Sequence, residues 1–165
     1  MRRLLAFTTL WLLIFLFGAL MLSSPEFSIS QETQSEEAKQ TKALVDEAAA
    51  LLQSKGTEAF IEFRKKDSKW LKDDTYIFVF KMNGIELFHP IEPELEGTNI
   101  IDLKDVNGKA YVQETIETAK TQGSGWIDYM LPKPGESKPS KKSSYFKKVK
   151  VGEETFIVGS GFYTD

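Results

Sequence analysis

The stretch DDTYIFVFKMNGIELFHP, residues 73–90, decides the fold class of this chain. Residues 75–81 are mostly β-branched or aromatic and alternate with the period of two that is typical of a β-strand. Asn83-Gly84 follows, and this dipeptide predicts a hairpin with a type I′ turn, in which residues 85–88 form the return strand. The stretch therefore predicts an antiparallel pair of strands near the centre of the chain.

The segments on either side of this hairpin complete the predicted domain. Residues 36–55 place Leu44, Ala48 and Leu51 on one helical face, and Gly56 follows as a stop signal. The other expected elements are a short helix at 57–66, a surface loop at 89–97, a helix at 109–121 and strands at 126–131, 144–151 and 155–163. Strands that follow one another through short turns are antiparallel. We therefore predict an α+β fold: a five-stranded antiparallel sheet with a long N-terminal helix packed across it.

The N-terminus carries a separate segment. Arg2 and Arg3 precede residues 4–22, which are apolar and hold no charged side chain. That length suits a membrane-spanning helix better than the shorter apolar core of a secretory signal, and basic flanks stay on the cytoplasmic side. We predict a signal peptide or an uncleaved signal anchor with its linker at residues 1–30. Residues 31–165 are then exported, to the periplasmic or extracellular face of the cytoplasmic membrane.

The composition excludes several classes of function. The chain has no cysteine and only one histidine, His89, which excludes disulfides, thiol catalysis and metal sites built from several histidines. A net charge of −3 argues against nucleic-acid binding. Residues 103–108 resemble part of a calcium-binding loop, but Leu103 would occupy the first ligand position, so a simple turn is favoured. We expect that the protein is not an enzyme and that it binds neither a metal nor a cofactor.

The strand at residues 75–81 presents apolar side chains on both faces. Tyr76, Phe78 and Phe80 alternate with Ile77 and Val79. The N-terminal helix can cover one face, whereas the other must be covered by the loops around 90–100 and 131–143. A sheet face under loops can hold a small ligand pocket or a packed core, and the residues alone leave both open. The lysines between residues 133 and 150 leave a similar choice open. All of them can be solvated, or one or two can point into the domain.

Residues 73–114 resemble the core of the bacterial single Cache domains. The resemblance lies in a D-x-Y-x-F-V strand, a glycine turn, an HP dipeptide, a G-x-N-x-x-D segment and a D-x-x-G-K turn into a helix. The second half of the chain is also similar, through GSGWIDYMLPKP at 123–134, KSSYFK at 142–147 and GSGFY at 159–163. The resemblance spans about residues 40–163.

The resemblance implies a PAS-like domain that senses small molecules outside the cytoplasm, typically short carboxylic acids. Its implied pocket residues are Trp126 and Tyr129 from the G-W-x-x-Y motif, Lys142 and Tyr145 from the K-x-x-Y motif, with Tyr76 and His89 at the rim. Lys142 would neutralise the carboxylate of a small organic anion, and the tyrosine hydroxyls would donate hydrogen bonds to it.

Two features depart from the family pattern. Phe88 precedes the HP dipeptide, where relatives often have a small residue, and is expected to narrow the pocket. The chain also reaches Asp165 without a kinase or a methyl-accepting segment. We therefore expect an extracytoplasmic binding and sensing domain that acts through a separate, unidentified membrane signalling protein. The alternatives are a protein–protein interaction module whose degenerate pocket is filled by its own side chains, and an enzyme that depends on His89.

Overall fold

The structure is a computed structural model, and it describes residues 25–164 of the chain. The predicted membrane segment at residues 4–22 lies outside this range. Within residues 25–164, no helix combines the length and the apolar character needed to cross a membrane. The predicted boundary at residue 30 falls inside the first helix, which begins at Pro25.

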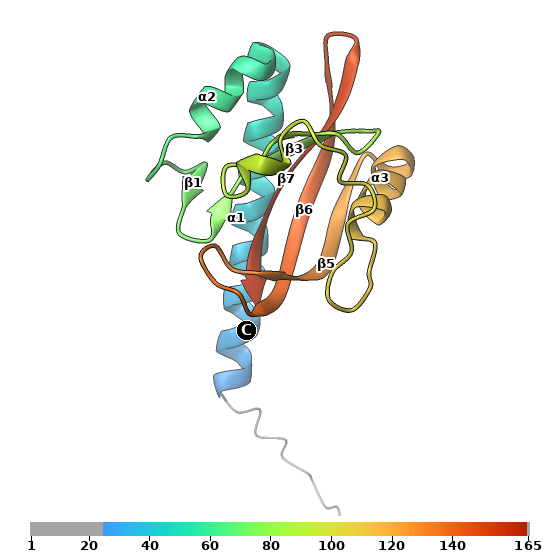
Figure 1. Cartoon of the computed structure of the whole chain (residues 1–165). Helices are drawn as coiled ribbons and strands as arrows, with labels where there is room; N and C mark the ends of the chain where they lie inside the picture. The colour runs from blue at the N-terminus through green and yellow to red at the C-terminus, as the bar shows by residue number, and fades with distance from the viewer. Residues whose placement is uncertain (1–24, 165) are drawn as a thin grey trace, which may run out of the picture.

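The chain runs through helices and strands in the order shown in Figure 1. The helical elements are α1 (Pro25–Lys55), η1 (Gly56–Glu58), α2 (Ala59–Phe63), η2 (Pro93–Leu95) and α3 (Tyr111–Gln122). The strands are β1 (Leu71–Lys72), β2 (Thr75–Tyr76), β3 (Phe78–Lys81), β4 (Glu86–Phe88), β5 (Ser124–Pro132), β6 (Pro139–Val151) and β7 (Glu154–Thr164).

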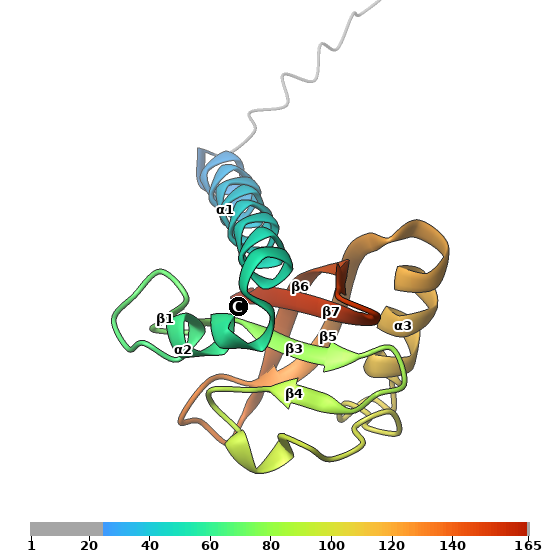
Figure 2. The same ribbon diagram turned by 90° about the horizontal axis from the view of Figure 1, so that it is seen from above.

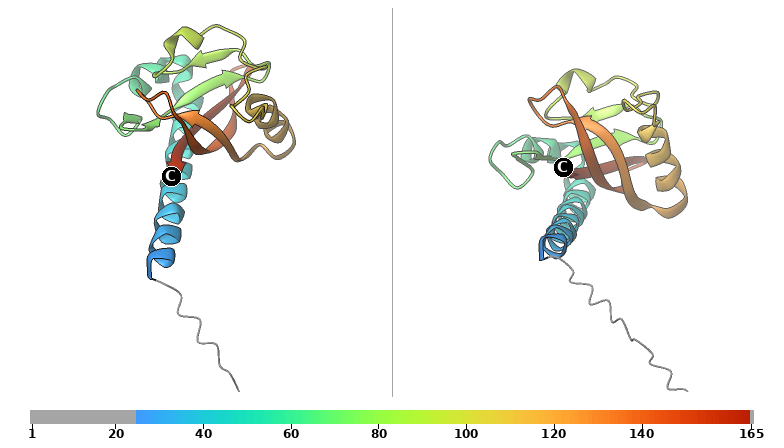
Figure 3. Two further views of the ribbon diagram at one scale, coloured as in Figure 1. Left: turned by 60° about the horizontal axis from the view of Figure 1, so that its bottom comes forward. Right: turned by 90° about the horizontal axis from the view of Figure 1, so that it is seen from below.

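The main sheet has the strand order β4-β3-β7-β6-β5, and every neighbouring pair is antiparallel. Helix α1 packs across β6 and β7 on one face, whereas α3 and the segment at residues 89–110 lie over the other (Figure 2). Helix α1 continues past the sheet at its N-terminal end (Figure 3). The predicted α+β fold, with its five-stranded antiparallel sheet and long N-terminal helix, is confirmed.

The two faces of the sheet hold two separate apolar cores. The core under α1 joins Val45, Leu52 and Phe63 to Val79 and Val158 of the sheet. The core on the other face is made by the alternate positions, among them Phe80, Ile116, Ile127, Phe146 and Ile157. This division follows from the period of two along each strand, which sends neighbouring side chains to opposite faces.

The central hairpin differs from its prediction in the turn. The backbone N–H of Gly84 donates to the carbonyl of Lys81 at 2.9 Å, and that of Lys81 donates to the carbonyl of Ile85 at 2.8 Å. Gly84 has a φ of +85°, whereas Asn83 is not among the residues with positive φ. A type I′ turn needs two such residues, so the type I′ prediction was wrong. The loop is the three-residue kind, closed by one left-handed glycine.

Three other boundaries differ from prediction. Helix α1 begins at Pro25, well before the expected residue 36. Thr57 gives no side-chain cap to the short helix, because it lies inside η1. Strand β5 ends at Pro132 and strand β6 begins at Pro139, so the loop expected at 131–143 is much shorter than predicted. Because of this shift, Lys142 lies inside a strand and not at a loop edge.

Candidate ligand-binding site

A small cavity lies between the sheet and the covering layer of α3 and residues 89–110. The space open to the centre of a water molecule is about 50 Å³, enough for roughly four waters. Its walls are mainly apolar and aromatic, with a few polar side chains from separate elements: Tyr76, Glu86, His89, Glu92, Tyr111, Thr115 and Tyr129. A second hollow of about 240 Å³ adjoins the loop at Pro132–Glu136, and Tyr76, Glu92 and Leu131 border both. An apolar chamber with a few converging polar groups is typical of small-molecule sites.

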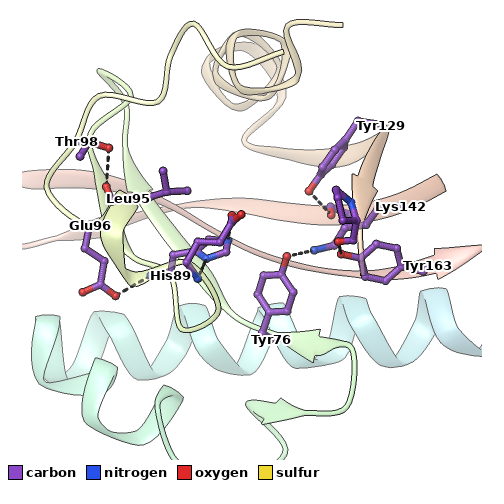
Figure 4. Close-up of polar contacts among 11 residues, drawn as sticks. Tyr76, His89, Leu95, Glu96, Thr98, Tyr129, Lys142 and Tyr163 are labelled. Atoms are coloured by element: carbon purple, nitrogen blue, oxygen red, sulfur yellow. Dashed lines mark hydrogen bonds and ion pairs between the residues drawn. The ribbon is translucent and has the colours of Figure 1, made fainter. Parts of the chain in front are cut away.

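Lys142 approaches this cavity from β6 across the neighbouring strand β7. Its side chain is 1% exposed. A Cβ atom on Gly161 of β7 would lie 2.9 Å from Lys142 Cε, so the glycine leaves the space through which the lysine passes. Lys142 Nζ then donates a hydrogen bond of 2.6 Å to the Tyr76 hydroxyl (Figure 4). The ammonium also lies 3.9 Å from the centre of the Tyr76 ring and 5.1 Å from that of Tyr163.

The charge on Lys142 lacks a close counter-ion. Among the described residues, no carboxylate lies within ion-pair distance of Lys142 Nζ. Burial lowers the pKa of Lys142 to about 7, and the more distant Glu92 and Asp74 carboxylates only partly oppose this shift. A buried ammonium without a charged partner is costly, so the charged form of Lys142 is disfavoured in the empty protein.

Tyr76 and His89 stand together beside Lys142. Their ring centres are 5.2 Å apart, and both line the cavity. The backbone N–H of Glu92 donates to His89 Nδ1 at 2.9 Å, which places the ring proton of the neutral imidazole on Nε2. Burial lowers the pKa of His89 to about 4, with a further decrease from the charge of Lys142. His89 is therefore neutral at pH 7, with its proton on Nε2, which lies 3.8 Å from a Glu92 carboxylate oxygen.

Tyr129 forms the opposite wall of the cavity. Its ring stacks on Tyr111 with the centres 4.5 Å apart, and its hydroxyl lies 3.1 Å from Ser144 Oγ. Burial raises the pKa of Tyr129 well above its ordinary value, so the hydroxyl keeps its proton. Tyr76, His89 and Tyr129 thus border the cavity, and Lys142 lies directly behind the Tyr76 hydroxyl.

The structure places Trp126 and Tyr145 on the other face of the sheet. Tyr145 belongs to the core under α1, and Trp126 packs on Tyr145 and Phe162 with 41% of its surface exposed. The reason is the strand geometry: the tryptophan and tyrosine of G-W-x-x-Y, like the lysine and tyrosine of K-x-x-Y, are three positions apart, and positions i and i+3 of a strand face opposite sides. Of these motifs, Tyr129 lines the cavity and Lys142 lies on the same face of the sheet, behind Tyr76, so the candidate site is assigned without Trp126 and Tyr145.

Phe88 also lies away from the cavity. It is fully buried in the core under α1, where its ring stacks on Phe60 with the centres 5.0 Å apart. The expectation that Phe88 narrows the pocket is therefore wrong, and the interaction-module alternative loses the feature that favoured it.

Sequence reasoning missed several polar residues of the site. Glu86, Glu92 and Tyr111 line the cavity, and the Tyr163 ring packs on Lys142 Nζ. The predicted two-residue turn would have paired Glu86 with Lys81, and Glu86 lies opposite Phe80 because the loop has three residues and the register shifts next to Phe80. Glu92 comes from an irregular segment, for which no period predicts the side-chain direction, whereas Tyr111 is the first residue of α3.

A family model described as Cache domain matches residues 64–165. The chain belongs to the Cache domain family. This agrees with the resemblance seen in the sequence, and the single Cache domain accounts for the sheet, α3 and the candidate site.

Two curated relatives of this Cache domain are signalling proteins. The methyl-accepting chemotaxis protein McpP of Pseudomonas putida KT2440 is 33% identical over 92 residues, which are 56% of this chain and 16% of the relative. The sensor histidine kinase MctS of Rhizobium johnstonii is 34% identical over 92 residues, which are 56% of this chain and 19% of that protein. The aligned part of the chain is therefore less than a fifth of the length of either relative.

Two solved structures share the fold with a TM-score of 0.68 each. One is a periplasmic sensor domain of a chemotaxis protein, with 28% identity, covering 81% of this chain and 98% of that one. The other is a Cache chemosensory domain described for its recognition of carboxylic acids, with 27% identity, covering 82% of this chain and 98% of that one.

Proposed function

We propose that this Cache domain is an extracytoplasmic sensor that binds a short carboxylate beside Tyr76, His89 and Lys142. The observation that carries the proposal is the buried Lys142 ammonium, which has the neutral Tyr76 hydroxyl as its hydrogen-bond partner and no carboxylate at ion-pair distance among residues 36–164. A ligand carboxylate supplies the missing charge. Charge-assisted hydrogen bonds of this kind contribute about 1.5–3 kcal/mol each.

The surrounding groups suit a carboxylate. Tyr76 and His89 both lie at the cavity wall and are both uncharged. The Tyr76 hydroxyl and the His89 Nε2–H can therefore each donate a hydrogen bond to the carboxylate whose charge Lys142 neutralises. The aromatic walls exclude water, which strengthens each polar contact. The solved relative that recognises carboxylic acids supports the same ligand class.

Ligand binding to this domain would then be signalled to a membrane signalling protein. The chemotaxis protein and the sensor kinase that this chain resembles support that role. The polar groups of the cavity serve recognition in this proposal, and His89, the only histidine, has no nucleophile among its hydrogen-bond partners within residues 36–164. We therefore propose binding and not catalysis.

Thermal unfolding of the full chain with acetate, propanoate and butanoate tests the proposal. A ligand at 100 times its dissociation constant stabilises the folded state by about 2.7 kcal/mol, which raises the midpoint by several degrees. We expect this increase for at least one acid, and its loss in Lys142→Met. Lys141→Met is the matched control, because Lys141 is half exposed and pairs with Asp128 on the other face. An absence of any increase, or an equal increase in Lys142→Met, contradicts the proposal.

A further inference from the structure

The cavity between the sheet and α3 has an acidic end at Glu86. We propose that this end is a second binding site, which takes a small primary alkylammonium whose N–H groups donate hydrogen bonds to the Glu86 carboxylate. The inference goes beyond the proposed carboxylate site and does not depend on it, because it involves neither Lys142 nor a ligand that bridges the two ends.

Glu86 has the features of a group that lacks its partner. The residue is 2% exposed and lines the cavity from β4. Its backbone is already paired, since its N–H donates to the carbonyl of Thr98 at 3.0 Å and its carbonyl accepts from the Gly97 N–H at 2.8 Å. A backbone hydrogen bond from Val79 supports the charged form of the carboxyl, but its oxygen Oε1 is buried and has no hydrogen-bond partner among the described residues. A buried oxygen in this state favours a donor that a ligand brings in.

The charges around the cavity favour a cation as that donor. The described residues that line it include two carboxyl groups, Glu86 and Glu92, and no lysine or arginine, while His89 is neutral at pH 7. Burial raises the pKa of Glu86 to about 9, and the charges of Glu96 and Glu92 add to this shift. A ligand ammonium opposes both effects, because it pairs with the carboxylate and offsets the acidic neighbours. On binding, it takes the place of the carboxyl proton of Glu86, which passes to the solvent.

Aromatic rings supply further contacts for a cation. Tyr111 and Tyr129 stack with their ring centres 4.5 Å apart, and Phe78 and Phe80 stack with theirs 6.2 Å apart. All four rings line the cavity, and an ammonium within about 6 Å of a ring centre is attracted by the ring face. A tetraalkylammonium can use the rings but has no N–H for Oε1, whereas an alcohol has the donor but not the charge. The site therefore favours a primary ammonium over either.

The size of the cavity limits the ligand to a short chain. Space for roughly four waters corresponds to about four non-hydrogen atoms, which is the size of propylammonium. The alkyl part can lie against the apolar side chains that line the same cavity, among them Ile100, Val112 and Ile127. Propylammonium is therefore the probe that the cavity fits.

The ammonium and the carboxylate of the proposed function are separate ligands. Lys142 pairs with Tyr163 of β7. Glu86 lies at the level of Ile157 of the same strand, about 20 Å away along it. Lys142 lies behind Tyr76, which also borders the larger hollow beside the Pro132–Glu136 loop. That hollow leaves room for the carboxylate while the ammonium occupies the Glu86 end of the cavity.

Calorimetric titration of propylammonium, tetramethylammonium and 1-propanol into the full chain at pH 7 tests the inference. We expect propylammonium to bind at least tenfold more tightly than the other two. Measured in two buffers of different ionisation enthalpy, its binding should release close to one proton per ligand, because the Glu86 carboxyl is protonated in the empty protein. Glu86→Gln should remove both the preference and the proton release. Glu153→Gln, an exposed position at the β6–β7 turn, should keep both.

The inference is overturned if propylammonium does not bind, if it binds no more tightly than tetramethylammonium or 1-propanol, or if it releases no proton. An unchanged preference in Glu86→Gln overturns it as well. Its failure is distinguishable from that of the proposed function, because Lys142→Met should bind propylammonium as the wild type does and Glu86→Gln should still bind butanoate. If butanoate binds and propylammonium does not, the carboxylate site stands and the ammonium site falls. If propylammonium binds as expected and no acid binds, the reverse holds.

Discussion

Lys142 Nζ and the Tyr76 hydroxyl are joined by a 2.6 Å hydrogen bond that spans β7. The lysine comes from β6 and the tyrosine from β2, and the two meet at the cavity only because Gly161 leaves room between them. This bond gives a buried ammonium a neutral partner. Tyr76 lines the cavity and Lys142 does not, so this bond links the buried charge to the cavity wall.

Removing the Lys142 charge should abolish carboxylate binding and stabilise the empty protein near neutral pH. The folded-state pKa of Lys142 is about 7, below the ordinary 10.5, so the folded protein binds fewer protons than the unfolded chain between these values. The contribution of Lys142 to wild-type stability should therefore rise as the pH increases from 7 to 10.5, and between pH 7 and 9 Glu86 opposes it. In Lys142→Met this rise should disappear, and the unfolding midpoint at pH 6.5 should increase by several degrees. Lys141→Met should retain the wild-type pH profile.

Glu86→Gln should also stabilise the protein, with the opposite dependence on pH. The folded-state pKa of Glu86 is about 9, above the ordinary 4.5, so the contribution of Glu86 to wild-type stability should fall as the pH rises through this window. At pH 7 the cost is about 3 kcal/mol. Urea unfolding at pH 5, 7 and 9 should show the gain of Glu86→Gln increasing with pH. A gain that stays constant with pH would show that Glu86 does not titrate in this range.

Trp126→Ala should leave carboxylate binding unchanged, because the indole lies on the α1 face. Its cost in unfolding free energy should be about 1–2 kcal/mol, below the roughly 3–5 kcal/mol of a fully buried aromatic residue, since 41% of the side chain is exposed. Tyr145→Ala should cost more, because Tyr145 is only 6% exposed, and should also retain binding. Loss of affinity in a folded Trp126→Ala protein would contradict the assignment of faces.

Gly161→Ala should weaken both stability and binding. The new Cβ would lie 2.3 Å from Ser144 Oγ, 2.7 Å from the carbonyl oxygen of Ser143 and 2.9 Å from Lys142 Cε. Such overpacking costs about 1–3 kcal/mol and displaces the lysine from Tyr76. Gly152→Ala is a useful comparison, because its cost comes from a φ of +62° in a turn with no neighbour within 4 Å. It should lose stability and keep its affinity for butanoate.

The sequence predicted the fold well because the period of two around Val79 and the helical stripe of α1 are local signals. For the candidate site, motif resemblance grouped Tyr76, His89, Tyr129 and Lys142 with Trp126 and Tyr145, because a motif does not state which face each position takes. The structure places the first three at the cavity, Lys142 behind Tyr76, and the last two on the other face of the sheet.

Counting positions along the predicted strands would have separated the two faces. What no local pattern shows is the reach of Lys142 over Gly161 to Tyr76, because that contact joins residues distant in the chain. The unpaired Oε1 of Glu86 likewise becomes visible only when the packing of the covering layer is known.

The most direct test of the account is a calorimetric count of protons taken up when butanoate binds to the full chain at pH 8, measured in two buffers of different ionisation enthalpy. At this pH most of the empty protein has a neutral Lys142, and bound carboxylate requires it charged. The account predicts an uptake close to one proton per ligand, an affinity that falls above pH 7, and no heat of binding in Lys142→Met. Binding without proton uptake, or with the same uptake in Lys142→Met, would contradict the claim that Lys142 receives the carboxylate.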